Sequence, residues 1–436
     1  MINYLFYLKQ CFACFSLFEK DFQFSTFDVS VLWVALGFLP PPNTGKTLED
    51  ISIQFLYELQ SRSFIQDFVD FGVGYCAFKL HDLVHDLALY VARDEFQLLK
   101  FHNENIFENV LHLSFIKNEL LGLTPVPTGL RTMIFPEGAS NEAFLKTLAS
   151  RCKFLRVLQL VDSRYESLPR SIGKLKHLRY LNLENNKELK SLPDSVCKLQ
   201  NLQTLNLSGC INLQALPNGI GNLISLRQLR ITTKQYTFPD KEIAKLKSLE
   251  YLFFEDCDNL EMLLFEGIQL SNLKWLDIAS CGNLKSMPPL HVFPNLEILG
   301  INNCHQLKLS LGNDNKIPKL KLKALVLQSL PQLVSFPEWL QGCADTLLTL
   351  VIVDCENLDE LPVWLSTLIC LNKLAIQNCP KLLSLPDDID CLSKLEYLQI
   401  EGCPELCTRY QPQVGRNWHK ISHIKKVIVE SKEFQD

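Results

Sequence analysis

Leucines recur at one fixed spacing through most of the chain, and this repeat constrains the fold more than any other feature of the sequence. One copy begins at Leu178 and continues with Leu181, Leu183, Asn186 and Leu189. A register held over many copies predicts one structural unit per copy, each stacked on the next. The spacing returns every 23 to 26 residues, in copies that begin at Leu155, Leu178, Leu202, Leu226, Leu249, Leu273, Leu296, Leu322, Leu347, Leu371 and Leu395.

The spacing L-x-x-L-x-L-x-x-N/C-x-x-L is the signature of the leucine-rich repeat, in which each copy supplies one short strand to a solenoid. The leucines are expected to point inward, and the residues between them to face the concave side. Weaker copies at Val110 and Leu130 precede the eleven clear ones, and the total exceeds the three or so copies that bury a continuous core. We therefore predict an α/β fold, a horseshoe solenoid with a parallel β concave face.

Three further features of the repeats give local predictions. Ser-Leu-Pro segments such as Ser167–Pro169 should turn the chain to the convex side, because proline cannot continue a strand ladder. The long step after Leu296, which contains SLGNDNKIP, predicts an insertion loop. The last apolar run predicts a capping strand at Lys426–Glu430, which would shield the final repeat.

Seven of the sixteen cysteines are placed by the repeat itself. Each lies eight residues after the first leucine of its copy, where a small, weakly polar side chain turns inward beside the strand. They are Cys210, Cys257, Cys281, Cys304, Cys355, Cys379 and Cys403. The other cysteines show no paired spacing. Packing in a reducing compartment therefore explains the cysteines better than a disulfide framework, and we expect a cytoplasmic protein.

The first hundred residues lack the repeat and predict a small, mostly helical domain. Apolar residues spaced by three or four from Leu5 to Phe18 indicate a buried helix, and residues 27–39 and 48–65 indicate two more. The prolines at Pro40–Pro42 would end the second helix. An extended segment at residues 75–80 and a further helix from about Asp82 follow. Three helices before a short strand pair give the outline of a winged helix.

Four segments of this region, LKQCFACFSLF, LWVALGFL, YELQSRSFIQ and FKLHDLVHDLALYVA, together resemble the last subdomain of the nucleotide-binding module of plant intracellular disease-resistance receptors. That subdomain is a winged helix immediately before leucine-rich repeats, so the resemblance covers nearly the whole chain and is most specific at residues 8–92. The family's Met-His-Asp signature corresponds to Leu80, His81 and Asp82, with leucine in place of methionine. Glu19 is a further departure, where the family often has proline.

The resemblance implies a role for His81 and Asp82. In the family the histidine of this signature contacts the phosphates of bound ADP and helps to hold the receptor inactive. His81 is therefore the candidate nucleotide contact, and Asp82 is its supporting residue. The family's phosphate-binding loop and metal-binding acidic strand are expected upstream of Met1. We expect no cofactor in this chain alone, and ADP or ATP only when the nucleotide-binding half is present.

Three motifs in this region resemble other sites. Asn43–Thr47 ends like a phosphate-binding P-loop, but Pro40 occupies the position of the motif's first glycine. His81–His85 resembles the zinc motif H-E-x-x-H, but aspartate replaces the glutamate and no third ligand is evident. Cys11 and Cys14 lack the second pair of a metal site, and their aromatic neighbours favour core packing.

The charge of the chain argues against nucleic acid as a partner. Residues 1–100 hold seven basic and twelve acidic residues, which accounts for the whole formal net charge of −5. The rest of the chain holds equal numbers of basic and acidic residues. A winged helix can enter the major groove of DNA, but this acidic excess opposes contact with the phosphate backbone. No apolar run reaches eighteen residues, so no membrane-spanning helix is expected either.

The strand positions between the inward leucines predict the partner-binding face. The third and fifth positions of the copies supply residues that we expect to be exposed: Tyr180, Asn182, Arg230, Tyr251, Phe253, Trp275, Asp277 and Tyr397. Tyr251, Phe253 and Trp275 would cluster on neighbouring strands among charged residues, which is the composition of interface hot spots. The alternative is that the adjoining winged helix covers some of these aromatic residues.

The predicted organisation is a winged-helix subdomain at residues 1–100, degenerate first repeats at 101–150, the solenoid at 151–412 and a capping segment at 413–436. The sequence itself indicates a non-enzymatic, protein-binding solenoid, since no nucleophile and base occur in a catalytic arrangement. The resemblance implies part of a plant immune receptor that senses a pathogen effector or a guarded host protein and restrains its nucleotide-binding half. The alternatives are a general intracellular leucine-rich-repeat scaffold and an ATPase that uses His81.

Overall fold

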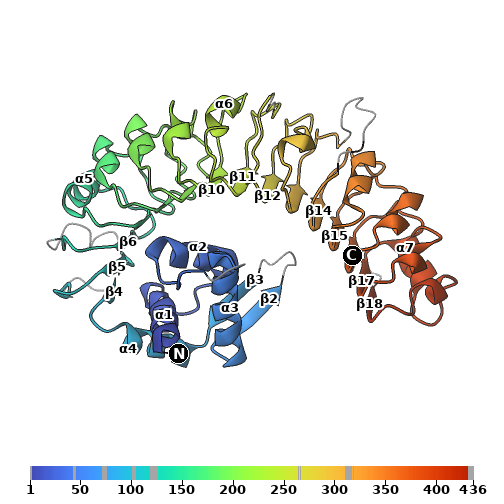
Figure 1. The fold of residues 1–436 in the computed structure, drawn as a ribbon, viewed down its shortest axis with the longest axis horizontal. Helices are drawn as coiled ribbons and strands as arrows, with labels where there is room; N and C mark the ends of the chain where they lie inside the picture. The colour runs from blue at the N-terminus through green and yellow to red at the C-terminus, as the bar shows by residue number, and fades with distance from the viewer. Residues whose placement is uncertain are drawn as a thin grey trace, which may run out of the picture. The chain divides into compact units, whose positions relative to one another are not determined.

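The computed structural model describes residues 2–42, 46–70, 76–100, 105–117, 126–263, 265, 267–309, 317 and 319–430 (Figure 1). The chain forms two compact units, residues 1–229 and 230–436. Two predictions fall partly outside the described residues. They are the turn at Asn43–Thr47, of which residues 43–45 are not described, and the insertion loop, of which 310–316 and 318 are not described.

The first unit begins with a helical domain. Its helices are α1 (Ile2–Ala13), α2 (Thr26–Leu36), α3 (Leu48–Ser61) and α4 (Asp82–Ala92), with the 3₁₀ turn η1 (Cys14–Leu17) after α1. Its strands form an antiparallel sheet in the order β1-β3-β2, with β1 at Phe24–Ser25, β2 at Ile65–Asp70 and β3 at Cys76–Leu80. Three helices followed by a strand pair confirm the predicted winged-helix outline.

Local chemistry sets the ends of α2 and α3. Thr47 and Asp50 form a capping box at the start of α3, in which each side chain accepts a hydrogen bond from the backbone N–H of the other residue. Helix α2 ends at Leu36 because Gly37 follows with φ 76°, a left-handed conformation that costs glycine little. The prolines Pro40–Pro42, which the sequence predicted to end this helix, lie beyond that point.

Aromatic side chains fill the core of the helical domain. Phe15 is fully buried there. Its ring packs against four others at centroid distances of 4.8–6.4 Å, those of Phe12, Phe24, Trp33 and Phe78. Cys11 and Cys14 are buried free thiols in the same core, so core packing accounts for both, as predicted.

The rest of the first unit consists of repeats. Six strands pair in parallel in sequence order: β4 (Phe96–Leu99), β5 (His112–Phe115), β6 (Thr132–Ile134), β7 (Val157–Gln159), β8 (Tyr180–Asn182) and β9 (Thr204–Leu207). Short helical segments return the chain between strands: α5 (Glu142–Arg151), η3 (Arg170–Lys174), η4 (Asp194–Lys198) and η5 (Ile220–Asn222). Strands β5 and β6 are the two weak copies. Strand β4 is an additional one, for which the sequence pattern gave no indication.

The second unit continues the repeat pattern. Strand β10 (Gln228–Ile231) contains the division between the units. The parallel strands of the second unit are β11 (Tyr251–Glu255), β12 (Trp275–Ala279), β13 (Ile298–Asn302), β14 (Ala324–Gln328), β15 (Thr349–Val353), β16 (Lys373–Gln377), β17 (Tyr397–Glu401) and β18 (Lys426–Glu430). Strand β18 is the predicted capping strand, and it pairs with β17.

The remaining helical segments of the second unit are short. They are α6 (Asp240–Ile243), η6 (Leu290–Val292), η7 (Glu338–Cys343), η8 (Val363–Thr367), η9 (Ile389–Cys391), α7 (Pro404–Tyr410) and η10 (Trp418–Lys420). Among the described residues of the whole chain, no helix has the length and apolar character needed to cross a bilayer.

Leucines and small polar side chains hold the repeats together. Inward leucines such as Leu276 are fully buried. Asn186 donates from Nδ2 to the carbonyl oxygens of Leu160 and Leu183, at 2.5 and 2.7 Å. Cys210, at the equivalent position of the next copy, donates from Sγ to the carbonyl of Leu183 at 3.1 Å. All sixteen cysteines are free and the seven at this position are buried, which confirms that the repeat explains them by packing.

Candidate functional site

Five of the predicted contact residues lie together in the second unit. They lie on the concave face of its strands, opposite the side on which the leucines are buried. They are Arg230, Tyr251, Phe253, Trp275 and Asp277, which we call the aromatic cluster. Each is partly exposed, because alternate strand positions face away from the core. Strands β11 and β12 pair Tyr251 with Trp275, and Phe253 with Asp277.

The aromatic rings of this cluster contact one another and a guanidinium group. The Phe253 and Trp275 rings meet edge to face, with centroids 5.3 Å apart and an interplanar angle of 89°. The centroids of Tyr251 and Trp275 are 6.5 Å apart. Arg230 holds its guanidinium carbon 5.3 Å from the centre of the Phe253 ring, within range of a cation–π interaction. The cluster therefore offers flat apolar surface with a fixed positive charge at one side.

The carboxyl group of Asp277 is enclosed within the aromatic cluster. Gly300 lies beside it on β13, so close that a Cβ at that position would meet Oδ2 at 2.5 Å. Burial raises the pKa of Asp277 from 3.8 to about 6, against the opposing effects of a hydrogen bond from Trp275 and the charge of Arg230. The nearby charge of Glu255 raises this pKa as well. The carboxyl group thus changes its charge near pH 6.

Tyr397 is apart from the aromatic cluster, on β17, and has partners of its own. The ammonium groups of Lys373 on β16 and Lys426 on β18 lie 5.1 and 5.2 Å from the centre of its ring. Its hydroxyl donates to Oε1 of Gln399 at 2.9 Å, and Gln399 in turn donates to Glu401. The two lysines were not among the predicted contact residues. The repeat spacing gives Lys373 an exposed third position, whereas Lys426 is placed beside Tyr397 by the pairing of the capping strand with β17. In the structure, the two ammonium groups form a positively charged group around the Tyr397 ring.

Tyr180 and Asn182, on β8 of the first unit, are buried, and the prediction that they are exposed is wrong. The Tyr180 ring belongs to the apolar core of the helical domain, which packs over this part of the repeats. Asn182 donates from Nδ2 to the Tyr180 hydroxyl at 3.4 Å, and its Oδ1 accepts from the backbone N–H of Glu184 at 2.9 Å. The repeat pattern predicts that both side chains point outward from the sheet. The helical domain, which is distant in sequence, covers them.

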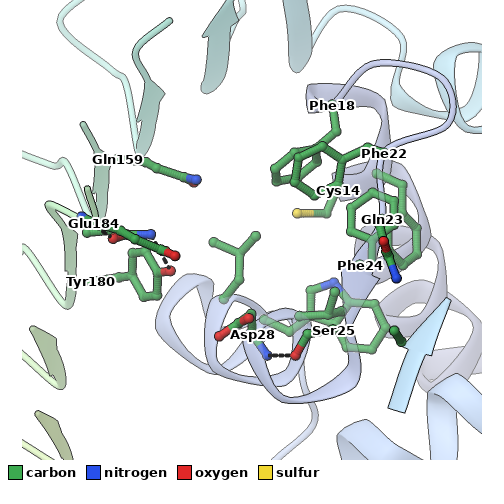
Figure 2. Close-up of a pocket in the computed structure, with 16 residues that line it drawn as sticks. Cys14, Phe18, Phe22, Gln23, Phe24, Ser25, Asp28, Gln159, Tyr180 and Glu184 are labelled. Atoms are coloured by element: carbon green, nitrogen blue, oxygen red, sulfur yellow. Dashed lines mark hydrogen bonds between the residues drawn. The ribbon is translucent and has the colours of Figure 1, made fainter. Parts of the chain in front are cut away.

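A pocket of about 460 Å³ lies beside Tyr180, between the helical domain and the first repeats. Figure 2 shows Gln159, Tyr180 and Glu184 on one side of the space, and Phe18 and Phe22 across from them. Asn206 donates from Nδ2 to Glu184 at 3.2 Å. The pocket is lined by Cys14, Phe15, Phe18, Phe22, Gln23, Phe24, Ser25, Asp28, Val29, Leu32, Trp33, Ala77, Gln159, Tyr180, Asn182 and Glu184. Sequence reasoning missed it, since no local pattern relates residues 14–33 to 159–184.

Three arginines of the first repeats contact the helical domain. Arg156 and Arg179 each donate from Nη1 to a backbone carbonyl at the C-terminal end of α2, at 2.6 and 3.4 Å. Arg227 forms an ion pair of 2.7 Å with Glu49, in the first turn of α3. Cations favour helix C-termini and anions favour helix N-termini, so each contact agrees with the dipole of its helix.

His81 and Asp82 lie at the start of α4, and both are exposed. His81 is the N-cap residue of this helix, where its Nδ1 accepts a hydrogen bond from the backbone N–H of Leu83 at 3.2 Å. A ring that accepts through Nδ1 carries its proton on Nε2, which is then a donor suited to a phosphate oxygen. The residues present therefore fit a single contact to a nucleotide phosphate.

The two other motifs of this region have structural roles. His85 is buried, and its Nε2 donates to the backbone carbonyl of Phe18 at 2.8 Å, so it helps to hold α4 against η1. Thr47 caps α3, and the Lys46 ammonium donates to Gln54 at 3.2 Å. Among the described residues, no group of three or more His, Cys, Asp or Glu side chains is placed to hold a metal ion.

Comparison with known families matches both parts of the chain. The family described as "Leucine-rich repeat region" matches residues 130–356, more than half of the chain, and the "Disease resistance protein Winged helix domain" matches residues 17–88. A solved structure of the leucine-rich-repeat protein LIC12759 from Leptospira interrogans has a TM-score of 0.45 at 22% identity, and the match covers 75% of this chain and 86% of that one.

Relatives from two plants are named as disease resistance proteins. The disease resistance protein At3g14460 of Arabidopsis thaliana is 34% identical over an alignment of 200 positions, and the match covers 41% of this chain and 13% of that protein. Disease resistance protein RGA2 of Solanum bulbocastanum is 33% identical over 174 residues, 39% of this chain and 15% of that protein. The chain thus spans about one seventh of the length of these curated relatives. The chain belongs to the leucine-rich-repeat family, and it carries the winged-helix domain and the repeats of plant disease-resistance proteins of the nucleotide-binding class.

Proposed function

We propose that this chain is the recognition part of a plant immune receptor, which acts in the cytoplasm by binding proteins and not by catalysis. The observation that supports this proposal most is the aromatic cluster of the second unit. Three large rings, a guanidinium group and an enclosed carboxyl group share one partly exposed face, and this is the composition of an interface hot spot. The partner would be a pathogen effector or a host protein that the receptor guards.

The extent of the face favours a protein over a small ligand. The aromatic cluster spreads its rings over neighbouring strands, and the group around Tyr397 lies five strands beyond Trp275. At the usual strand spacing these two groups are separated by about 24 Å. A partner that contacts both must therefore present a surface of protein size, and a specific protein interface typically uses 20–30 residues on each side.

We propose a second role for the first unit, which is restraint of the nucleotide-binding half. The contacts of Arg156, Arg179 and Arg227 fix the helical domain on the repeats, so the domain that carries His81 would follow any movement of the repeats. His81 would donate from Nε2 to a phosphate of ADP held by the separate nucleotide-binding half, with Asp82 beside it at the start of α4. This arrangement would connect partner binding on the repeats to the nucleotide.

Recognition can be tested by proximity labelling in leaf cells exposed to a pathogen. The wild-type chain is compared with Trp275→Ala and with a control, Val363→Ala, which changes a side chain that is 73% exposed in η8. We expect the wild type and the control to label specific proteins that Trp275→Ala does not label. Each of these proteins, once purified, should also bind the purified wild-type chain. Identical sets of labelled proteins for all three chains would contradict recognition by this face.

Restraint can be tested with a nucleotide-binding module supplied as a separate chain. We expect micromolar association, and slower release of ADP from the module when the wild-type chain is present than when His81→Ala is present. The chain alone should bind neither ADP nor ATP in isothermal titration. Binding and hydrolysis of ATP by the isolated chain would instead favour the ATPase alternative, and no association with the module would favour a general scaffold.

A further inference from the structure

The concave face of the second unit has a floor of small, uncharged side chains between its two charged groups. The register of β13 to β16 aligns Gly300, Val326, Val351 and Ala375 in one row across the sheet. Ile298 and Ala324 form a second row beside it, at the preceding outward positions of β13 and β14. We call these six residues the apolar floor. Gly300, Ala324 and Ala375 are buried in the surface of the sheet, whereas Ile298, Val326 and Val351 are partly exposed. No side chain of the floor is longer than isoleucine, so another chain can approach the sheet closely.

The two ends of the apolar floor carry opposite charge. Asp277 on β12 is the register partner of Gly300, and Glu255 stands exposed on β11 next to it. At the other end, Lys373 and Lys426 place their ammonium groups on either side of Tyr397. Arg230 lies beside Asp277 at the first end, and Glu401 lies beside Tyr397 at the second. A partner that lies along the floor from β12 to β17 therefore meets two carboxyl groups and one guanidinium group first, and two ammonium groups and one carboxyl group last.

Backbone hydrogen bonding decides which kind of segment fits this floor. The strands of the sheet pair with their neighbours, so their N–H and C=O groups are occupied within the sheet. An extended segment laid across the floor would bury its own N–H and C=O groups against apolar side chains without partners, which costs free energy for each group. An α-helix satisfies these groups internally and presents only side chains.

We propose that the apolar floor binds an amphipathic α-helix of a partner protein, which is basic at the end over Asp277 and acidic at the end over Lys373 and Lys426. The five strand spacings from β12 to β17 measure about 24 Å, which corresponds to a helix of about 16 residues. An apolar stripe repeating every three to four residues would lie on the floor. This inference rests on the proposed function and specifies the partner's chemistry.

The test uses the full chain and three synthetic 16-residue peptides with one leucine stripe in common. One peptide has two lysines at one end and two glutamates at the other, one has lysines at both ends, and one has glutamates at both ends. We expect the lysine–glutamate peptide to bind at least tenfold more tightly than the other two in fluorescence anisotropy. The same peptide with a central proline should lose at least tenfold in affinity, because proline breaks the helix.

Variants of the chain separate the floor from its charged ends. Val351→Glu places a charge in the middle of the floor and should abolish binding, whereas Val363→Glu, the same substitution at the exposed η8 position, should leave it unchanged. The double variant Lys373→Glu with Lys426→Glu makes both ends acidic. It should reverse the preference, so that the peptide with lysines at both ends binds most tightly.

The outcomes separate this inference from the proposed function. Equal affinity for all three charge patterns, or full binding of the proline peptide, would overturn the helix. If Val351→Glu still removes the proteins labelled in leaf cells while no helical peptide binds, recognition by this face stands and the helix is wrong. Reversal of the charge preference by the double lysine variant would establish both the site and the direction of the bound helix.

Discussion

The guanidinium group of Arg156 donates a hydrogen bond of 2.6 Å from Nη1 to the backbone carbonyl of Leu36, the last residue of α2. Arg179, from the next repeat, donates in the same way to the carbonyl of Ala35 at 3.4 Å. The two preceding carbonyl groups of the helix accept from the backbone N–H of Gly37. The four carbonyl groups that a helix end leaves open are therefore all satisfied, and the repeats satisfy two of them.

We expect Arg156→Ala combined with Arg179→Ala to loosen the helical domain from the repeats. Two helix carbonyls lose their donors, and a hydrogen bond to a charged group contributes about 1.5–3 kcal/mol. Amide hydrogen exchange should become faster in α2, whose end loses its capping, and in β7, which α2 covers. Exchange should also become faster in β8, because Tyr180 belongs to the core of the same domain. The inward leucines of β14 and β15 do not depend on these contacts, so exchange in those two strands should change little.

The control for this double variant is Arg170→Ala, which removes an exposed arginine from η3 in the same unit. It should leave the exchange of α2 and β7 at the wild-type rate. If the double variant also exchanges at the wild-type rate, the two arginines do not hold the domain. Its position would then depend on the apolar packing of Tyr180 and its neighbours and on the ion pair of Arg227 with Glu49.

Asp277→Asn should stabilise the second unit above pH 6. Because burial raises the pKa of Asp277 to about 6, the folded chain binds this proton more tightly than the unfolded chain does. The free energy of unfolding therefore falls as the pH rises from about 4 to about 6, and the loss persists above that. A shift of about two pKa units corresponds to at most about 3 kcal/mol, which asparagine would recover.

Thermal melts at pH 4 and pH 7.5 measure this effect. Asp277→Asn should melt at a higher temperature than the wild type at pH 7.5, and the difference should vanish at pH 4. Asp258→Asn makes the same change at an exposed position of the same unit and should leave the melting temperature unchanged at both values. A loss of stability in Asp277→Asn at pH 7.5 would show that the charged contacts with Arg230 and Trp275 outweigh the burial.

Thiol reagents should react with very few of the cysteines in the folded chain at neutral pH. Cys391 is exposed and Cys370 is half-buried, whereas the others are buried. Burial also raises the pKa of Cys14 and Cys210 to about 12, which keeps these thiols protonated and unreactive. Mass spectrometry after brief labelling should find Cys391 modified first, and denaturation without reductant should release all sixteen thiols. Fewer thiols after denaturation would contradict the free-cysteine arrangement.

The repeat spacing predicted the strands well because it is a local property of each copy. The copy at Leu273 alone indicates that Leu276 is buried and that Trp275 faces outward, and the structure has both in these positions. The capping strand was predictable from another local property, the apolar run at Lys426–Glu430. Which outward residues stay exposed is a different question, because the answer depends on contacts between parts of the chain that are far apart.

Tyr180 and Tyr251 show the difference. Both stand at the third position of a copy, and the pattern treats them alike. Tyr180 is buried because the helical domain packs over it, through contacts such as that of Arg156 with Leu36, which are 120 residues apart. Nothing in the spacing of either segment encodes that pairing. The pocket beside Tyr180 was unpredictable for the same reason.

The neighbouring residues Trp275 and Leu276 provide a direct test of which side of β12 is core and which is contact surface. Leu276→Ala removes a fully buried side chain and should lower the free energy of unfolding by about 2–5 kcal/mol. Trp275→Ala removes a half-buried ring that pairs with Phe253, and should cost only about 1 kcal/mol. Urea unfolding measures both free-energy changes. Under conditions in which both variants are folded, only Trp275→Ala should weaken partner binding. If Trp275→Ala were as destabilising as Leu276→Ala, Trp275 would belong to the core and the aromatic cluster would lose its central contact residue.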